Sequence, residues 1–301
     1  MTAPHDHPAG VRLRGIERLS GIAKVQVGLD AIERPGHPQS ATESLPRNGT
    51  LTAKAGPHVM SMPKVSGKAI KRIWEDDGYR LFLSHKSEVS KEANRLKKQL
   101  SVYGVSAFVA HTSIRPTLAW QAEIENALYS MDGLAALMTK DFHESEWTDQ
   151  EVGFALGRHV PTIPVRLGKN PYGFLGRIQA LSSSWDTAAE DIVKLLIAYD
   201  VMFDAYLQAI RDCGSYDDAN LLAGILPSIE QLDDNQVAAL VDAYNSNEQV
   251  HGSYGFNGSR RYRYGHGLLP PLNRFGSQQY EMSDAPYYHI RPASVAKKKR
   301  R

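Results

Sequence analysis

A glutamate one helical turn after a tryptophan is the first candidate for chemistry in this sequence. Glu123 follows Trp120 in the segment 118–131, LAWQAEIENALYSM, whose apolar residues recur at the spacing of an amphipathic helix. At about 100° per residue these residues form one stripe, namely Trp120, Ile124, Ala127, Leu128 and Met131. Glu123 lies at the edge of this stripe, whereas Glu125 projects away from it. We therefore expect Glu123 to border a cleft while partly shielded from water, the alternative being an ordinary surface glutamate.

Short β-prone runs alternate with helical segments around this helix. The expected strands are 79–84, 105–110, 133–138, 160–167 and a short one near 182–185, and the expected helices are 86–104, 118–131 and 145–159. Gly104 ends the expected helix 86–104. The expected helix 145–159 begins either with Ser145 as N-cap or with a Thr148–Glu151 capping box. Strands that alternate with helices through short connections predict an α/β fold with a five-stranded parallel sheet of the flavodoxin-like kind.

Polar side chains follow the first predicted strand directly. Ser84, His85 and Lys86 come at its carboxyl end, and the loop 111–118 follows the second strand. Ligands of open parallel sheets bind outside the carboxyl ends of the strands, where the strand order switches. These residues are therefore expected at a cleft.

The rest of the chain divides into flanking regions. Residues 1–65 read as a disordered or linker arm, and 66–78 as a lead-in helix. The region 187–250 is expected to be helical, with either one long or two shorter helices over 187–212. The tail 251–301 reads as irregular and rich in glycine, aromatic and basic residues. Its part 251–267 could stack on single-stranded nucleic acid, but a flexible or locally packed connector is favoured.

Composition excludes several classes of protein. Among 301 residues, 42% are hydrophobic and 23% charged, as in a globular protein, and no run is long and apolar enough to span a membrane. The start MTAPHDHPAG has no signal-peptide core, and the single cysteine, Cys213, fits a reducing compartment, so a cytoplasmic location is expected. The histidines show no zinc-like spacing, so no metal site is predicted.

The net charge of +2 conceals a basic end. The last five residues, KKKRR at 297–301, carry five positive charges, so the remainder has a net charge of −3. A basic body is absent, and a nucleic-acid partner is therefore not expected. The tail is read as a solvated end, with a weak contact to an anionic surface or nucleic acid as the alternative.

Three separated motifs resemble the TIR (Toll/interleukin-1 receptor) domain, and they look most like bacterial members of that family. They are FLSHKSE at 82–88, the helix motif at 116–128 with Pro116 followed by WQAEIENAL at 120–128, and FHESEWTDQEVGFAL at 142–156. The resemblance covers 79–186 and implies a flavodoxin-like fold. It also implies one of two functions. Bacterial and plant members cleave NAD+ into nicotinamide and ADP-ribose or cyclic ADP-ribose, whereas other members are non-catalytic adaptors.

The resemblance assigns roles by position. It places the catalytic glutamate on Glu123 and the loop that borders the dinucleotide on Ser84, His85 and Lys86. By the same resemblance, Ile114 and Trp120 are expected to line the pocket around the nicotinamide ribose. Glu125 remains a minor candidate for the catalytic carboxylate. Where many members have a glycine ahead of the tryptophan, this chain has Pro116-Thr117-Leu118-Ala119, which puts the course of this loop and its assembly contacts in question.

A single carboxylate is sufficient for the implied reaction. Glycosidases usually use two carboxyl groups because the leaving oxygen must be protonated. Nicotinamide leaves NAD+ as a neutral molecule, so only an oxocarbenium-like ribose has to be stabilised. NAD+ is then the substrate, and no cofactor is required.

The bacterial resemblance further implies anti-phage defence signalling and a homo-oligomer that forms through TIR–TIR contacts. The region 187–250 would serve oligomerisation or sensing. The competing function is an adaptor that acts through TIR–TIR assembly alone. Glu123 favours the enzyme, because an adaptor has no need of a carboxylate there.

Overall fold

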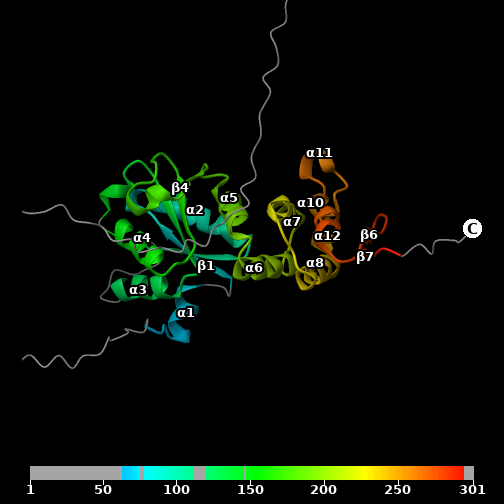
Figure 1. Cartoon of the computed structure of the whole chain (residues 1–301), viewed down its shortest axis with the longest axis horizontal. Helices are drawn as coiled ribbons and strands as arrows, with labels where there is room; N and C mark the ends of the chain where they lie inside the picture. Colours follow the sequence, from blue (N-terminus) through cyan, green and yellow to red (C-terminus); the bar gives the residue numbers. More distant parts are fainter. Residues whose placement is uncertain (1–62, 75–77, 111–119, 146, 295–301) are drawn as a thin grey trace, which may run out of the picture. The chain divides into compact units, whose positions relative to one another are not determined.

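The computed structural model describes residues 63–74, 78–110, 120–145 and 147–294, without the side chain of Tyr262 (Figure 1). The predicted arm, the loop 111–118 with Ile114, and the basic tail 297–301 lie outside these residues, apart from 63–65 of the arm. Where residues are described, the predicted order of strands and helices is present from 79 to 185.

A five-stranded parallel sheet forms the centre of the fold. Its strands are β1 (Tyr79–Ser84), β2 (Val105–Val109), β3 (Gly133–Met138), β4 (Thr162–Arg166) and β5 (Leu181–Ser182), in the order β2-β1-β3-β4-β5. This is the flavodoxin-like order, and it confirms the predicted fold class. The order reverses at β1, which pairs with β2 on one side and β3 on the other.

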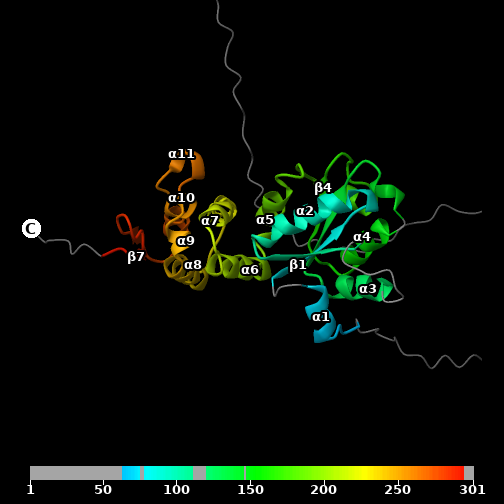
Figure 2. The same ribbon diagram turned by 180° about the vertical axis from the view of Figure 1, so that it is seen from behind.

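Helices cover both faces of the sheet. They are α1 (Gly67–Ile73), α2 (Ser90–Ser101), α3 (Trp120–Ser130), α4 (Thr148–Gly157) and α5 (Ala188–Leu196). Short 3-10 turns lie at η1 (Ser87–Val89), η2 (Phe142–Glu144) and η3 (Gly173–Arg177). Helix α1 lies within the segment 66–78 that was expected to form a lead-in helix, and Ser66 caps it by accepting a hydrogen bond from the amide of Ala69. Figure 2 shows α2 and α5 side by side.

Alternating side chains of β1 separate two hydrophobic cores. Leu81 and Leu83 point into a core that contains the buried residues of α2 and α5, whereas Phe82 points into the core beneath α1, α3 and α4. Successive side chains of a strand point to opposite faces, so Ser84 shares the face of Phe82. The polar end of β1 is therefore directed toward α3 and α4.

The chain after the sheet is more regular than the sequence suggests. The predicted helical stretch 187–212 forms two helices, α5 and α6 (Asp200–Arg211), followed by α7 (Tyr216–Ala223), the 3-10 turn η4 (Leu226–Ser228) and α8 (Asp234–Ser246). The expectation of an irregular tail is wrong for its first part. That part holds α9 (Glu248–His251), α10 (Tyr254–Asn257), α11 (Arg261–Tyr264), α12 (Leu269–Phe275) and an antiparallel hairpin of β6 (Tyr280–Met282) and β7 (Ile290–Pro292). Their buried side chains, such as Phe256 and Leu272, continue the α2–α5 core.

Gly104 brings the amino-terminal end of β2 against α6. It has φ +80°, and a Cβ on it would lie 2.3 Å from the carbonyl oxygen of Ala205. A side chain here would combine left-handed backbone strain with a clash against backbone that cannot rotate away. The approach of α6 to the sheet therefore requires glycine at this position.

Replacing Gly104 with alanine should destabilise the protein by about 2 kcal/mol or more, because strain and overpacking add. Urea unfolding measures the loss. The matched control is Gly153→Ala, since Gly153 is exposed within α4 and an added Cβ meets nothing within 4 Å. That control should leave stability unchanged or raise it by up to about 1 kcal/mol. Equal effects of the two substitutions would contradict the packing argument.

Candidate functional site

The carboxyl end of β1 holds a buried polar pair. The hydroxyl of Ser84 donates a hydrogen bond of 2.6 Å to the carboxylate of Glu151 on α4. Ser84 has no exposed surface, and Glu151 is only 3% exposed. Because β1 lies where the strand order reverses, this pair lies at the edge of the sheet where ligands of such folds bind.

Burial raises the pKa of Glu151 to about 7, and the hydrogen bond from Ser84 opposes this rise. No cation among the described residues contributes to the shift. Near neutral pH the carboxyl is therefore divided between its protonated and ionised forms. A group with this property at a ligand-binding edge is a candidate for chemistry.

His85 and Lys86 follow the pair along the chain. His85 is buried, and its Nδ1 lies 2.9 Å from the carbonyl oxygen of Leu83, which fixes the ring close to the strand end. The Lys86 ammonium contacts the carboxylates of Glu144 at 2.8 Å and Glu88 at 3.2 Å. The hydrogen bond to Glu144 raises the pKa of Lys86, and the same ion pair lowers the pKa of Glu144. The positive charge of Lys86 is thus shared with two carboxylates.

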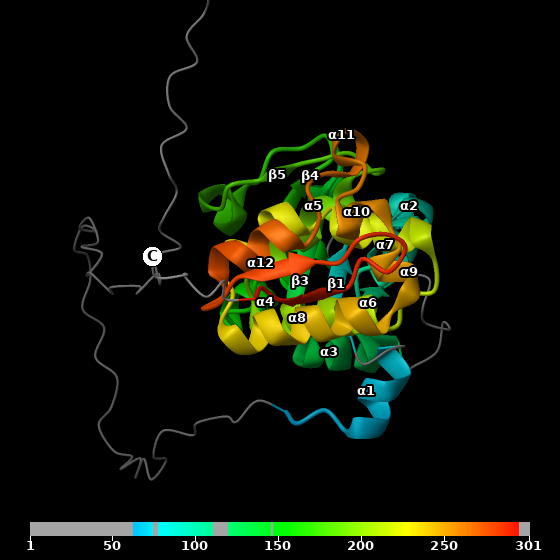
Figure 3. The same ribbon diagram turned by 90° about the vertical axis from the view of Figure 1, so that its right-hand side faces the viewer.

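Glu123 faces a different neighbour. Its carboxylate forms an ion pair of 2.5 Å with Arg72 of α1, and its side chain is 17% exposed. Figure 3 shows α1 lying beside α3. The predicted partial shielding of Glu123 is therefore present, but the shielding comes from α1. Glu123 is thus paired with Arg72 of α1 and not with any of the three residues at the end of β1.

Trp120 reaches toward α4. Its ring makes an edge-to-face contact with Trp147, with the two ring centroids 5.1 Å apart. Trp120 is half-buried, while the other four residues of the predicted stripe are buried. The prediction that Glu125 projects away from the core is confirmed, since it is exposed and accepts a hydrogen bond from Gln121.

The sequence interpretation missed Glu151, although a signal was present. Thr148, Glu151, Val152 and Ala155 are buried together at the spacing of one helix face. We interpreted Ser145 as the N-cap and a Thr148–Glu151 capping box as the alternative, and both predictions are wrong. The N-cap is Trp147 with no side-chain hydrogen bond, and the Thr148 hydroxyl donates to the carbonyl of Phe142. A glutamate on the apolar face of a short helix was the available signal.

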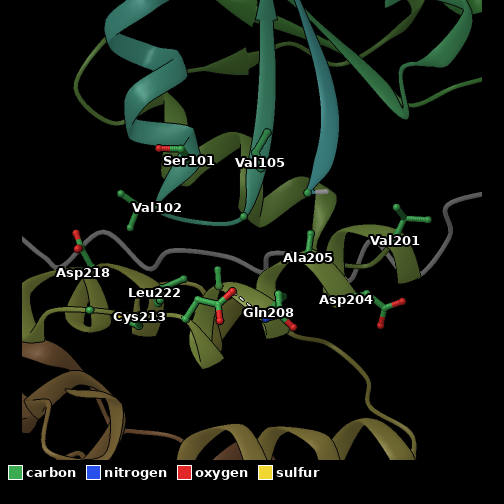
Figure 4. Close-up of a pocket in the computed structure, with 15 residues that line it drawn as sticks. Ser101, Val102, Val105, Val201, Asp204, Ala205, Gln208, Cys213, Asp218 and Leu222 are labelled. Atoms are coloured by element: carbon green, nitrogen blue, oxygen red, sulfur yellow. Dashed lines mark hydrogen bonds between the residues drawn. The ribbon is translucent and has the colours of Figure 1, made fainter. Parts of the chain in front are cut away.

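A cavity of about 820 Å³ lies at the opposite edge of the sheet, where β1 and β2 begin. Figure 4 shows Ser101 and Val102 on one side of it and Asp204 and Gln208 of α6 on the other. It contains none of the predicted site residues. Among the described residues no group of three histidine, cysteine, aspartate or glutamate side chains could hold a metal ion. No helix within the described ranges is both long and apolar enough to cross a membrane.

Comparison with known proteins identifies the family of one part of the chain. Residues 81–196 match the family model of the TIR domain. This part of the chain, which contains the sheet except for Tyr79 and Arg80 and includes the Ser84–Glu151 pair, is a TIR domain. The chain is also similar to the crystal structure of the TIR domain of the Toll-related receptor TRR-2 from Hydra magnipapillata. The identity is 19% over 39% of this chain and 95% of that chain, with a TM-score of 0.33. No curated protein matches the sequence.

The raised pKa of Glu151 predicts a pH-dependent stability. Between pH 4.5 and about 7 the folded protein binds more protons at this group than the unfolded chain, so stability falls as pH rises through this window. The full difference is about 3 kcal/mol. Glu151→Gln removes it, so the variant should gain stability relative to the wild type as pH rises from 5 to 8. Urea unfolding at several pH values measures this gain.

Two further variants sharpen the measurement. Ser84→Ala removes the hydrogen bond that favours the ionised carboxyl of Glu151, so the pKa of Glu151 rises further. The stability of this variant should therefore continue to fall with rising pH up to a higher pH than in the wild type. Glu125→Gln serves as the exposed control and should follow the wild type within about 0.5 kcal/mol. Parallel curves for the wild type and Glu151→Gln would show that Glu151 does not titrate in this range.

Proposed function

We propose that this protein is an NAD+ glycohydrolase that cleaves the bond between nicotinamide and ribose. The observation that carries the proposal is the buried Ser84–Glu151 pair at the ligand-binding edge of the TIR domain. The three TIR-like motifs support it, because two of them contribute the two members of this pair. The products would be nicotinamide and either ADP-ribose or cyclic ADP-ribose.

The reaction needs one fixed anion. As the bond between C1′ of the ribose and the nicotinamide nitrogen breaks, its electron pair moves to the ring, which leaves as a neutral molecule. The ribose becomes an oxocarbenium-like cation that a carboxylate stabilises electrostatically. Water then attacks C1′ and loses a proton to give ADP-ribose. Attack by the adenine ring instead gives the cyclic product.

Glu151 is the stronger of two candidates for this carboxylate. It lies at the strand end, shielded from water, and Ser84 orients it. Glu123, the candidate from the sequence, is neutralised by Arg72 across an ion pair of 2.5 Å. A carboxylate already paired with a guanidinium stabilises a ribosyl cation less well. Glu123 stays in the proposal as the alternative, with Arg72 needing to move away.

The remaining predicted residues take supporting roles. Ser84 and His85 shape the floor of the site, and Lys86 binds the pyrophosphate after releasing Glu88 or Glu144. Trp120 forms a wall together with Trp147. Ile114, predicted as a second wall residue, belongs to the loop outside the described residues.

The resemblance to bacterial TIR proteins also supports a wider role. In that role the protein is cytoplasmic, assembles as a homo-oligomer through TIR–TIR contacts, and depletes NAD+ or makes a nucleotide signal during anti-phage defence. A TIR adaptor that acts through assembly alone is the alternative. Turnover of NAD+ separates the two, because an adaptor releases no nicotinamide.

Chromatography of nicotinamide released from NAD+ tests the catalytic carboxylate. Glu151→Gln should lower kcat by about 10²-fold or more, because it removes the charge while keeping size and shape. Glu123→Gln should retain most of the activity, and the exposed Glu125→Gln should match the wild type. Circular dichroism verifies that each variant folds.

Two outcomes would change the assignment. Loss of turnover in Glu123→Gln with retention in Glu151→Gln would place the catalytic role on Glu123. A wild type that assembles at high concentration yet releases no nicotinamide there would support the adaptor. Assembly is measured by light scattering in the same samples.

The pH dependence of kcat provides an independent test. Because the ionised carboxylate stabilises the ribosyl cation, kcat should rise with pH and reach half its maximum near the Glu151 pKa of about 7. Ser84→Ala should move this midpoint to higher pH, since the hydrogen bond that lowers the pKa is lost. A midpoint that Ser84→Ala leaves unchanged would assign the titration to another group.

A further inference from the structure

A basic surface lies in the carboxyl-terminal region, far along the chain from the TIR domain. Between Glu248 and Glu281 the sequence contains four arginines and no acidic residue. All four are exposed, and three of them, Arg260, Arg261 and Arg263, lie within four residues of sequence. None of these three forms an ion pair with another described residue. Three uncompensated guanidinium groups thus share one short segment.

The segment 258–267, which we call the arginine–tyrosine loop, is closed at its base. The amide of Leu268 donates a hydrogen bond of 2.8 Å to the carbonyl of Phe256. A Cβ on Gly258 would lie 2.5 Å from the carbonyl oxygen of His266, so the two ends of the loop are in backbone contact. Compact loops with adjoining ends hold their side chains in place. The arginines are therefore presented by an ordered segment, and Figure 1 shows its helix α11 next to α10.

The loop rests on an anchored helix. The amide of Gly255 in α10 donates a hydrogen bond of 2.8 Å to the side-chain oxygen of Asn220 on α7. Phe256 is completely buried. Binding to this surface would thus need little ordering of the backbone, which lowers the entropic cost of binding.

Two tyrosine rings and two guanidinium groups pack against one another at this loop. The rings of Tyr254 and Tyr264 are 5.7 Å apart at an interplanar angle of 31°. The guanidinium of Arg260 lies 4.0 Å from the centroid of the Tyr254 ring, and that of Arg263 lies 5.2 Å from the Tyr264 ring. Both tyrosines are half-buried, so part of each residue remains accessible to solvent. A pair of aromatic rings flanked by planar cations offers nucleobases a surface on which to stack.

We propose that the arginine–tyrosine loop, together with Tyr254 of the adjoining helix α10, binds single-stranded nucleic acid, with the arginines contacting phosphates and the rings of Tyr254 and Tyr264 stacking on bases. An unpaired strand fits better than a duplex, because duplex bases are already stacked on each other. A membrane fits less well. None of the exposed large apolar side chains that the structure describes lies in this loop, so nothing there would enter the lipid.

The proposal refines the interpretation of the sequence. A packed connector was favoured over a nucleic-acid contact for 251–267, and the segment is indeed packed at its base. This packing at the base leaves the side of the segment that carries the exposed arginines accessible to a ligand. Without the tail 297–301 the chain has a net charge of −3, so the positive charge of this face is local and does not reflect a basic protein as a whole.

Fluorescence anisotropy with a labelled oligo-dT about 20 nucleotides long tests the proposal on the full chain. The triple variant Arg260→Gln, Arg261→Gln, Arg263→Gln should bind at least about tenfold more weakly than the wild type at low salt. Its plot of log affinity against log salt should be shallower by about 2, as expected for three lost phosphate contacts to a single strand. The tail 297–301 is identical in both proteins, so the difference reports on the loop.

Matched variants separate the loop from bulk charge. Lys91→Gln, Arg95→Gln, Lys98→Gln removes three exposed positive charges from α2 and should bind as the wild type does. Tyr254→Leu, Tyr264→Leu should weaken binding about tenfold, while Tyr254→Phe, Tyr264→Phe keeps the rings and retains affinity. Equal loss in the α2 variant, or full binding by the loop triple variant, would overturn the proposal.

Competitors test the identity of the ligand. The unlabelled single strand should displace the probe, whereas a duplex of the same length and inorganic polyphosphate should compete poorly at equal phosphate concentration. Equal competition by polyphosphate, or binding to phosphatidylserine vesicles but not to the oligonucleotide, would refute base stacking. None of these measurements depends on NAD+ turnover, so a failure here leaves the proposed enzymatic function untouched.

Discussion

Strand β1 is buried on both faces and is paired on both sides, with β2 and with β3, so every polar group at its carboxyl end needs a partner within the protein. The alternation of side chains directs Leu83 into one core and Ser84 into the other. On that second face helix α4 supplies Glu151, and the hydrogen bond from the hydroxyl to the carboxylate satisfies Ser84. The same burial that fixes the sheet therefore also fixes the position and the raised pKa of the carboxyl group.

The opposite end of the sheet is occupied by the helical region. Gly104 precedes β2 and allows the backbone of α6 to come close, and the core formed with α2 and α5 runs on through α8 to Phe256 and Leu272. The helices after the TIR domain are thus part of one continuous hydrophobic core. A site at the carboxyl edge and a helical region at the amino edge use different ends of the same strands. A ligand bound at the carboxyl edge would therefore leave the packing at the amino edge undisturbed.

Much of the fold could be predicted from the sequence, because strands β1 to β4 and their helices have strong periodic patterns. The candidate site was harder to predict. A helical projection correctly placed Glu123 beside the apolar stripe, but its partner Arg72 lies on a helix far away in the sequence, which no projection shows. The role of Glu151 was missed for a local reason. A glutamate in the first turn of a helix is usually a capping residue, and Glu151 was interpreted as one. Glycine-rich residues after 250 were expected to be irregular, and tertiary packing of residues such as Phe256 overrode that weak local preference.

The cost of burying Glu151 argues that the carboxyl has a use beyond packing. Its pKa is shifted to about 7 by burial, no described cation offsets this shift, and near neutral pH the ionised form destabilises the fold. A glutamine could accept the hydrogen bond from Ser84 without this penalty, and an apolar side chain would suit the neighbouring Val152 and Ala155. Stabilising a ribosyl cation requires what those alternatives lack, namely a negative charge held in a poorly hydrated place. The arrangement is thus costly for a purely structural helix and favourable for a catalyst that acts with one carboxylate.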